Sequence, residues 1–115
     1  MTSQGRPYGF FQKALRSGNV LAAVAAAREL PQVSLGDALE LTILIARKDP
    51  SRHQRVTARW LQRLLEEDPA VTIEEAGPAA SCLIALPGVG HQEAAETLRA
   101  MSERATSRRR ARGVA

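Results

Sequence analysis

The stretch "LGDALELTILIARK" at residues 35–48 has the pattern of a helix that is apolar around most of its circumference. Ser34 supplies an N-cap side chain, and Asp37, three residues later, completes a pattern like a capping box. On a helical wheel the polar side chains keep only a narrow strip, with Leu44 in its middle. A helix with so little polar surface is buried on most sides, so we expect it at the centre of the domain. Leu44 is then either partly exposed or covered by a partner.

Capping residues and helix breakers predict five further helices around this one. Gly18 and Asn19 stand between the first two, and Asp49 followed by Pro50 opens the helix after the central one. The connections are short, so consecutive helices should be antiparallel neighbours. The expected ranges are about 7–17, 20–30, 50–67, 73–86 and 91–104.

A weak internal repeat suggests how these helices are arranged. "PQVSLGDA" at residues 31–38 matches "PAVTIEEA" at residues 69–76, at an offset of 38 residues. A period of this length is typical of stacked helical hairpins, although any pair of capped helices can give a similar pattern. We therefore predict an all-α fold of about six helices in three stacked antiparallel hairpins, either a short α-solenoid or a compact helical bundle.

Over about residues 8–104, this period and capping resemble short HEAT-like or tetratricopeptide-like repeats. The Trp, Gly, Tyr and Pro positions of the tetratricopeptide pattern are not met, so the resemblance concerns the repeat class alone. The Ala- and Arg-rich composition also resembles that of small helical proteins of high-GC bacteria. The resemblance to repeat proteins implies binding rather than catalysis.

The length and composition are those of one small cytoplasmic domain. The chain has 115 residues, 44% of them hydrophobic, and a single cysteine that cannot form an internal disulfide. No signal peptide and no membrane-spanning run is recognisable at the sequence level. We expect a helical domain over residues 1–105 and a disordered basic tail over residues 106–115, because the tail has no apolar periodicity.

The net charge of +4 is unevenly distributed, and basic residues gather in two places. The segment "RHQRVTARWLQR" at residues 52–63 places four arginines on one helix face, where equal charges repel one another. This stripe is either a solvated face or a surface for an anionic partner such as phosphate. The tail is either a solubilising end or a nonspecific anion binder. The candidate binding residues are Arg52, Arg55, Arg59, Arg63, Arg108, Arg109, Arg110 and Arg112.

No catalytic, cofactor or metal motif can be assembled from the sequence. His53 and His91 have no Cys or His neighbour at metal-ligand spacing, and Cys82 lies among small apolar residues. We therefore expect no enzymatic activity, no cofactor and no metal ion.

These patterns favour a small non-enzymatic interaction module, an adaptor or regulatory protein that binds another protein through a helical face. The candidate protein interface consists of Leu44, Tyr8, Phe10 and Phe11, and a homodimer is an expected state. The alternative is a nucleic-acid-associated regulatory protein that uses the arginine stripe and the tail.

Overall fold

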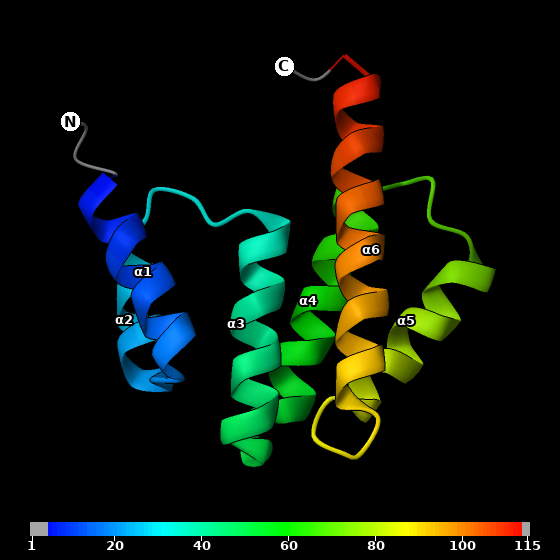
Figure 1. The fold of residues 1–115 in the computed structure, drawn as a ribbon. Coiled ribbons are helices and arrows are strands. Elements are labelled where there is room, and N and C mark those ends of the chain that lie inside the picture. Colours follow the sequence, from blue (N-terminus) through cyan, green and yellow to red (C-terminus); the bar gives the residue numbers. More distant parts are fainter. Residues whose placement is uncertain (1–4, 114–115) are drawn as a thin grey trace.

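The computed structural model describes residues 5–113, which form six α-helices and no strand (Figure 1). The all-α class and the six helices predicted from the sequence are confirmed. A 3₁₀ turn at Pro50–Arg52 precedes the fourth helix. The helices are α1 (Gly5–Ser17), α2 (Val20–Glu29), α3 (Leu35–Lys48), α4 (His53–Glu67), α5 (Ile73–Ala85) and α6 (His91–Ala111).

Several helix ends lie where the capping residues predicted them. The side chains of Asn19 and Ser34 each accept a hydrogen bond of 3.0 Å from a backbone N–H three residues later. Gly18 ends α1 with a φ of +71°, a left-handed conformation that favours glycine. Thr72 and Glu75 form a capping box in which the Thr72 backbone N–H donates to the Glu75 carboxylate, and this bond lowers the pKa of Glu75.

The start of α4 differs from the prediction. Asp49 was expected to cap a helix beginning at Pro50, but a 3₁₀ turn covers Pro50–Arg52 and α4 begins at His53. The Asp49 carboxylate accepts a hydrogen bond of 2.6 Å from the Ser51 hydroxyl and makes no capping bond to the backbone. A local side-chain bond has therefore replaced the N-cap bond.

Helices α3 to α6 enclose the main core. α3 contacts α1, α2, α4 and α6, so its predicted central position is confirmed. α6 packs against α3, α4 and α5, whereas α5 lies outside and contacts only α4 and α6 (Figure 1). The most extensive contacts join α1 to α2, α3 to α4 and α5 to α6, which are the three predicted hairpins, and their arrangement is consistent with a small helical bundle. The larger buried side chains of this core are Leu35, Leu39, Trp60, Leu64, Leu83, Leu86 and Leu98.

The two copies of the sequence repeat share a cap but not an environment. Leu35 follows the first cap and is 4% exposed, whereas Ile73 follows the second and is 86% exposed. Leu35 begins α3, which is central, whereas Ile73 begins α5, which is peripheral, and this explains the difference in exposure. A structural repeat therefore stays a prediction.

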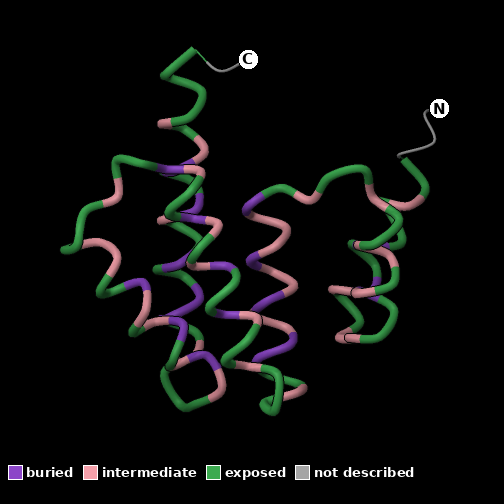
Figure 2. The backbone as a smooth tube through the Cα atoms, turned by 180° about the vertical axis from the view of Figure 1, so that it is seen from behind, coloured by how far each residue is buried: buried purple, intermediate pink, exposed green. Residues whose placement is uncertain are grey.

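The α1–α2 hairpin contributes few buried side chains. Phe11, Ala14 and Ala23 are its buried residues, and none of them belongs to the main core. The hairpin is accordingly mostly exposed or half-buried in Figure 2. Phe11 is fully buried, so its predicted place on a protein interface is wrong. Tyr8 and Phe10 on the same helix are exposed, as expected of interface candidates.

The prediction of a disordered tail over residues 106–115 is wrong for residues 106–111, which continue α6. Arg108 donates hydrogen bonds to the carboxylates of Asp68 at 2.9 Å and Glu75 at 3.3 Å. These ion pairs join residues far apart in the sequence and neutralise charges that would otherwise repel within the helix. Residues 114 and 115 lie outside the described part of the chain.

Candidate functional site

Two grooves run along α3, on opposite sides of its contact with the α1–α2 hairpin. The first lies between α1 and α3 and has a volume of about 510 Å³. The second lies between α2, α3 and α4 and has a volume of about 350 Å³. Both volumes are in the range of ligand-binding clefts, so the chemistry of the linings distinguishes them.

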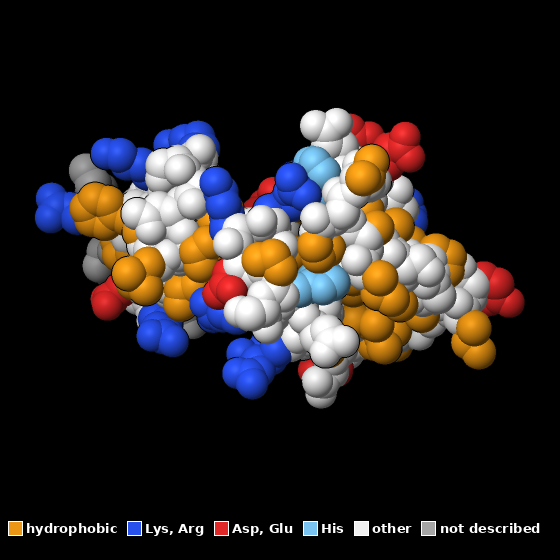
Figure 3. Space-filling model, turned by 90° about the horizontal axis from the view of Figure 1, so that it is seen from below, with side chains coloured by type: hydrophobic (Ala, Val, Ile, Leu, Met, Phe, Trp, Pro, Cys, Tyr) orange, Lys and Arg blue, Asp and Glu red, His pale blue; other side chains and the backbone are white. Residues whose placement is uncertain are grey.

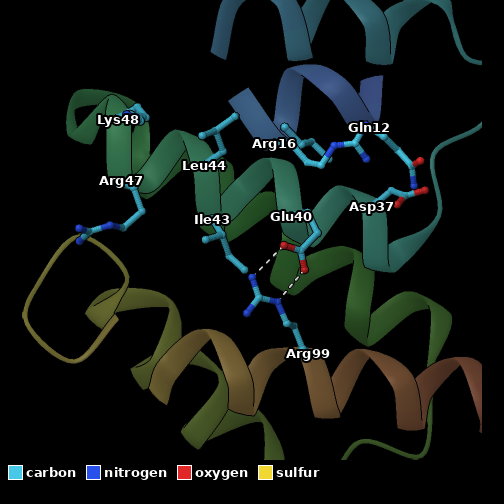
Figure 4. A pocket seen from close by; sticks show the side chains of 10 residues that line it. Gln12, Arg16, Asp37, Glu40, Ile43, Leu44, Arg47, Lys48 and Arg99 are labelled. Carbon is cyan, nitrogen blue, oxygen red and sulfur yellow. Dashed lines mark hydrogen bonds and ion pairs between the residues drawn. The ribbon is translucent and has the colours of Figure 1, made fainter. Parts of the chain in front are cut away.

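The first groove carries charges of both signs, and some of them already have partners. Arg99 of α6 forms a bidentate ion pair with Glu40 of α3, with N–O distances of 2.8 and 2.9 Å (Figure 4). Arg47 donates to backbone carbonyls at the end of α5, including that of Pro87 at 3.3 Å. Leu44 is half-buried in this lining, in agreement with its predicted partial exposure. Because the lining combines acidic and basic side chains, the groove favours no ligand of one charge.

The second groove, here called the arginine groove, combines an apolar floor with cationic walls. Its polar lining consists of Thr42 and four arginines, and none of the described residues that line it is acidic. The apolar lining comprises Val24, Ala27, Val33, Ala38, Leu41, Ile45, Val56 and Trp60, and the arginines are Arg28, Arg52, Arg59 and Arg63.

Trp60 fixes the orientation of α4 and hence of the arginines. Its side chain is 2% exposed and its indole N–H donates to the Leu35 carbonyl of α3 at 3.1 Å. Trp60 is therefore almost completely buried against α3. It lies on the buried face of α4 with Thr57 and Leu64, whereas Ala58 and Leu65 are exposed. This orientation turns the arginine side of α4 toward α2.

The four arginines of the stripe therefore have different surroundings. Arg63 bonds to the Glu67 carboxylate and to the Val33 carbonyl, so it also holds the chain between α2 and α3. Arg52 lies 4.0 Å from Asp49. Arg59 lines the groove and has no ion pair within residues 5–113.

Arg55 is exposed but does not line the arginine groove. Arg28, by contrast, lines it from α2 and has no ion pair with any described residue. The sequence alone did not single out Arg28, because it is a lone arginine at the end of an alanine-rich helix. Only the packing of α2 beside α3 brings it near the stripe.

The second basic cluster is largely neutralised. Arg108 pairs with Asp68 and Glu75, and these bonds raise the pKa of the Arg108 guanidinium. Arg109 contacts Glu67 at 3.3 Å. Arg112 lies 3.8 Å from Asp68 and Arg110 is exposed, so the cluster presents less free positive charge than its sequence suggests.

The charge of the whole molecule is asymmetric. In the view of Figure 3, Lys and Arg side chains gather over the α1–α2 end and the middle, whereas Asp and Glu side chains are scattered and outnumber the basic ones only at the end where α5 lies. This agrees with the sequence, in which residues 71–105 contain five acidic and two basic residues. The arginine groove lies in the basic part of the molecule.

Nothing in the described residues resembles a metal centre. Within residues 5–113, His, Cys, Asp and Glu side chains nowhere gather in threes in an arrangement able to hold a metal ion. The His53 ring donates from Nε2 to the Leu83 carbonyl at 2.6 Å, a contact between α4 and α5. None of the helices between residues 5 and 113 has the length and apolar character needed to cross a bilayer.

Comparison with known proteins gives no relative. No protein-family model matches the chain. No curated protein and no solved structure is significantly similar to it.

Proposed function

We propose that the protein is a small non-enzymatic interaction module that binds a segment of another protein in the arginine groove. The observation that carries this proposal is an open apolar groove of about 350 Å³ with four arginines and no acidic side chain in its lining. Protein interfaces are enriched in Arg and aromatic residues around an apolar centre, and the groove has this composition.

An ordinary solvated helix face accounts less well for this arrangement. Arg59 and Arg28 come from two helices and converge on one groove, although their charges repel. The half-buried aliphatic side chains between them, such as Val24 and Val56, still present apolar surface to water, which is also unfavourable. A partner with carboxylates and apolar side chains would remove both costs at once.

Nucleic acid is the competing partner, and the tail weighs against it. Arg108, Arg109 and Arg112 are engaged with acidic side chains of the same chain. Phosphate binding by the stripe would also draw on Arg55, which is exposed outside the groove. Arg55 therefore distinguishes the two partners.

The test is affinity capture from a native lysate of the source cells, with and without nuclease treatment. The proposal expects a protein retained by the wild type and lost with the double substitution Arg28→Glu and Arg59→Glu. Arg55→Glu on the same helix is the matched control and should retain the protein. Capture that disappears with nuclease, or that depends on Arg55 as much as on Arg59, would contradict the proposal and favour nucleic acid.

A further inference from the structure

We infer that the occupant of the arginine groove is an acidic amphipathic helix of about three turns, a step that rests on the function proposed above. The argument concerns three properties of the groove: the secondary structure of its walls, its length and the placement of its charges.

The walls favour a helical occupant. α2, α3 and α4 provide the lining, and the backbone groups of these helices are hydrogen-bonded within each helix. The groove therefore offers no strand edge on which an extended peptide could pair its own N–H and C=O groups. A helix satisfies these groups internally and needs only side-chain contacts, as in other helix-in-groove complexes.

The arginines of α4 and of the 3₁₀ turn directly before it indicate the length. Arg52 and Arg63 lie eleven residues apart on the groove side, and Arg59 lies between them. At about 1.5 Å of rise per residue, this part of the α4 wall is about 16 Å long, which equals about three turns of a partner helix.

The two walls indicate the charge pattern. α2 and α4 do not contact each other and are separated by α3, which forms the floor. Arg28 on α2 and Arg59 on α4 therefore flank the apolar floor from opposite sides. An occupant that satisfies both walls has an apolar stripe at positions i, i+4, i+7 and i+11, with Asp or Glu on both sides of it.

The probe for this inference is a synthetic peptide of about fifteen residues with Leu at these four positions, Glu beside them and Ala elsewhere. A control peptide has the same composition but carries its Glu residues on the face opposite the Leu stripe. Trp60 is the only tryptophan and lines the groove, so its fluorescence reports occupancy in the full-length protein. Calorimetry provides a second measurement.

The expected result is that the first peptide binds and changes the Trp60 emission, whereas the control peptide binds at least about tenfold more weakly. Arg28→Glu or Arg59→Glu should each weaken binding about tenfold or more, and Arg55→Glu should leave it unchanged. Equal affinity for both peptides, or equal effects of Arg55→Glu and Arg59→Glu, would overturn the inference.

The two proposals fail in different ways. A captured protein that depends on Arg28 and Arg59, together with no binding of the helical peptide, would reject the acidic helix and leave the interaction module. If neither protein capture nor peptide binding is observed, both the interaction module and the acidic helix are rejected. Self-association through the groove, detected as sedimentation that depends on Arg59, would replace the acidic helix by a second copy of the chain.

Discussion

At the scale of single residues, Trp60 connects the core to the surface. It is almost completely buried, it bonds to the Leu35 carbonyl of α3, and its ring also lines the arginine groove. Its burial agrees with the general tendency of tryptophan side chains to be largely buried. Its place at the centre of the buried face could not be read from a helical wheel, since the contact with Leu35 depends on how α3 and α4 pack.

We predict that Trp60→Ala lowers the free energy of unfolding by about 3–5 kcal/mol, because a large side chain leaves a cavity between α3 and α4. Trp60→Phe keeps most of the apolar contact and should cost clearly less. Denaturant titration followed by far-UV circular dichroism measures both values. Equal losses for the two variants would show that the indole hydrogen bond, and not packing, dominates.

At the scale of elements, the end of α6 shows the limit of local sequence patterns. "SRRRAR" at residues 107–112 has no apolar stripe, so no amphipathic pattern predicts a helix there. This helical end is held by acidic residues about forty positions earlier in the chain. The main one is Asp68, which is 2% exposed and forms ion pairs with Arg108 and Arg112. The caps at Asn19, Ser34 and Thr72 were predictable, in contrast, because both partners of each bond lie within one turn.

We predict that Asp68→Ala lowers the free energy of unfolding by about 1.5–3 kcal/mol, the usual value for hydrogen bonds to a charged group. The same change should speed amide hydrogen exchange in residues 106–111, which mass spectrometry can follow. Arg110→Ala serves as the control, because Arg110 is exposed and has no ion pair in the described chain. Unchanged exchange in Asp68→Ala would mean that the helix end is stable without its acid.

At the scale of the whole molecule, the chain divides into a four-helix bundle and an attached hairpin. The bundle contains all residues of the main core, whereas α1 and α2 bury only Phe11, Ala14 and Ala23. The class and the central helix were predictable from apolar patterns. The packing of α6 against both α3 and α4 could not be predicted. A repeat at an offset of 38 residues indicates which helices follow one another along the chain, but not which helices make contact across a bundle.

We predict that residues 31–115 fold without the hairpin and unfold in one cooperative step on heating. The full chain should show faster amide exchange in α1 and α2 than in α3, because few buried apolar contacts hold the hairpin. Circular dichroism and exchange measurements test this. A shortened chain without a cooperative transition would show that α1 and α2 are part of the folding unit.

The separate hairpin also has an evolutionary consequence. One wall of the arginine groove belongs to the bundle, where a change at Trp60 alters stability and the binding surface together. The other wall belongs to α2, where Val24, Ala27 and Arg28 lie outside the main core. Selection can therefore adjust partner preference on the α2 wall at little cost to folding, so related chains should diverge in specificity there first.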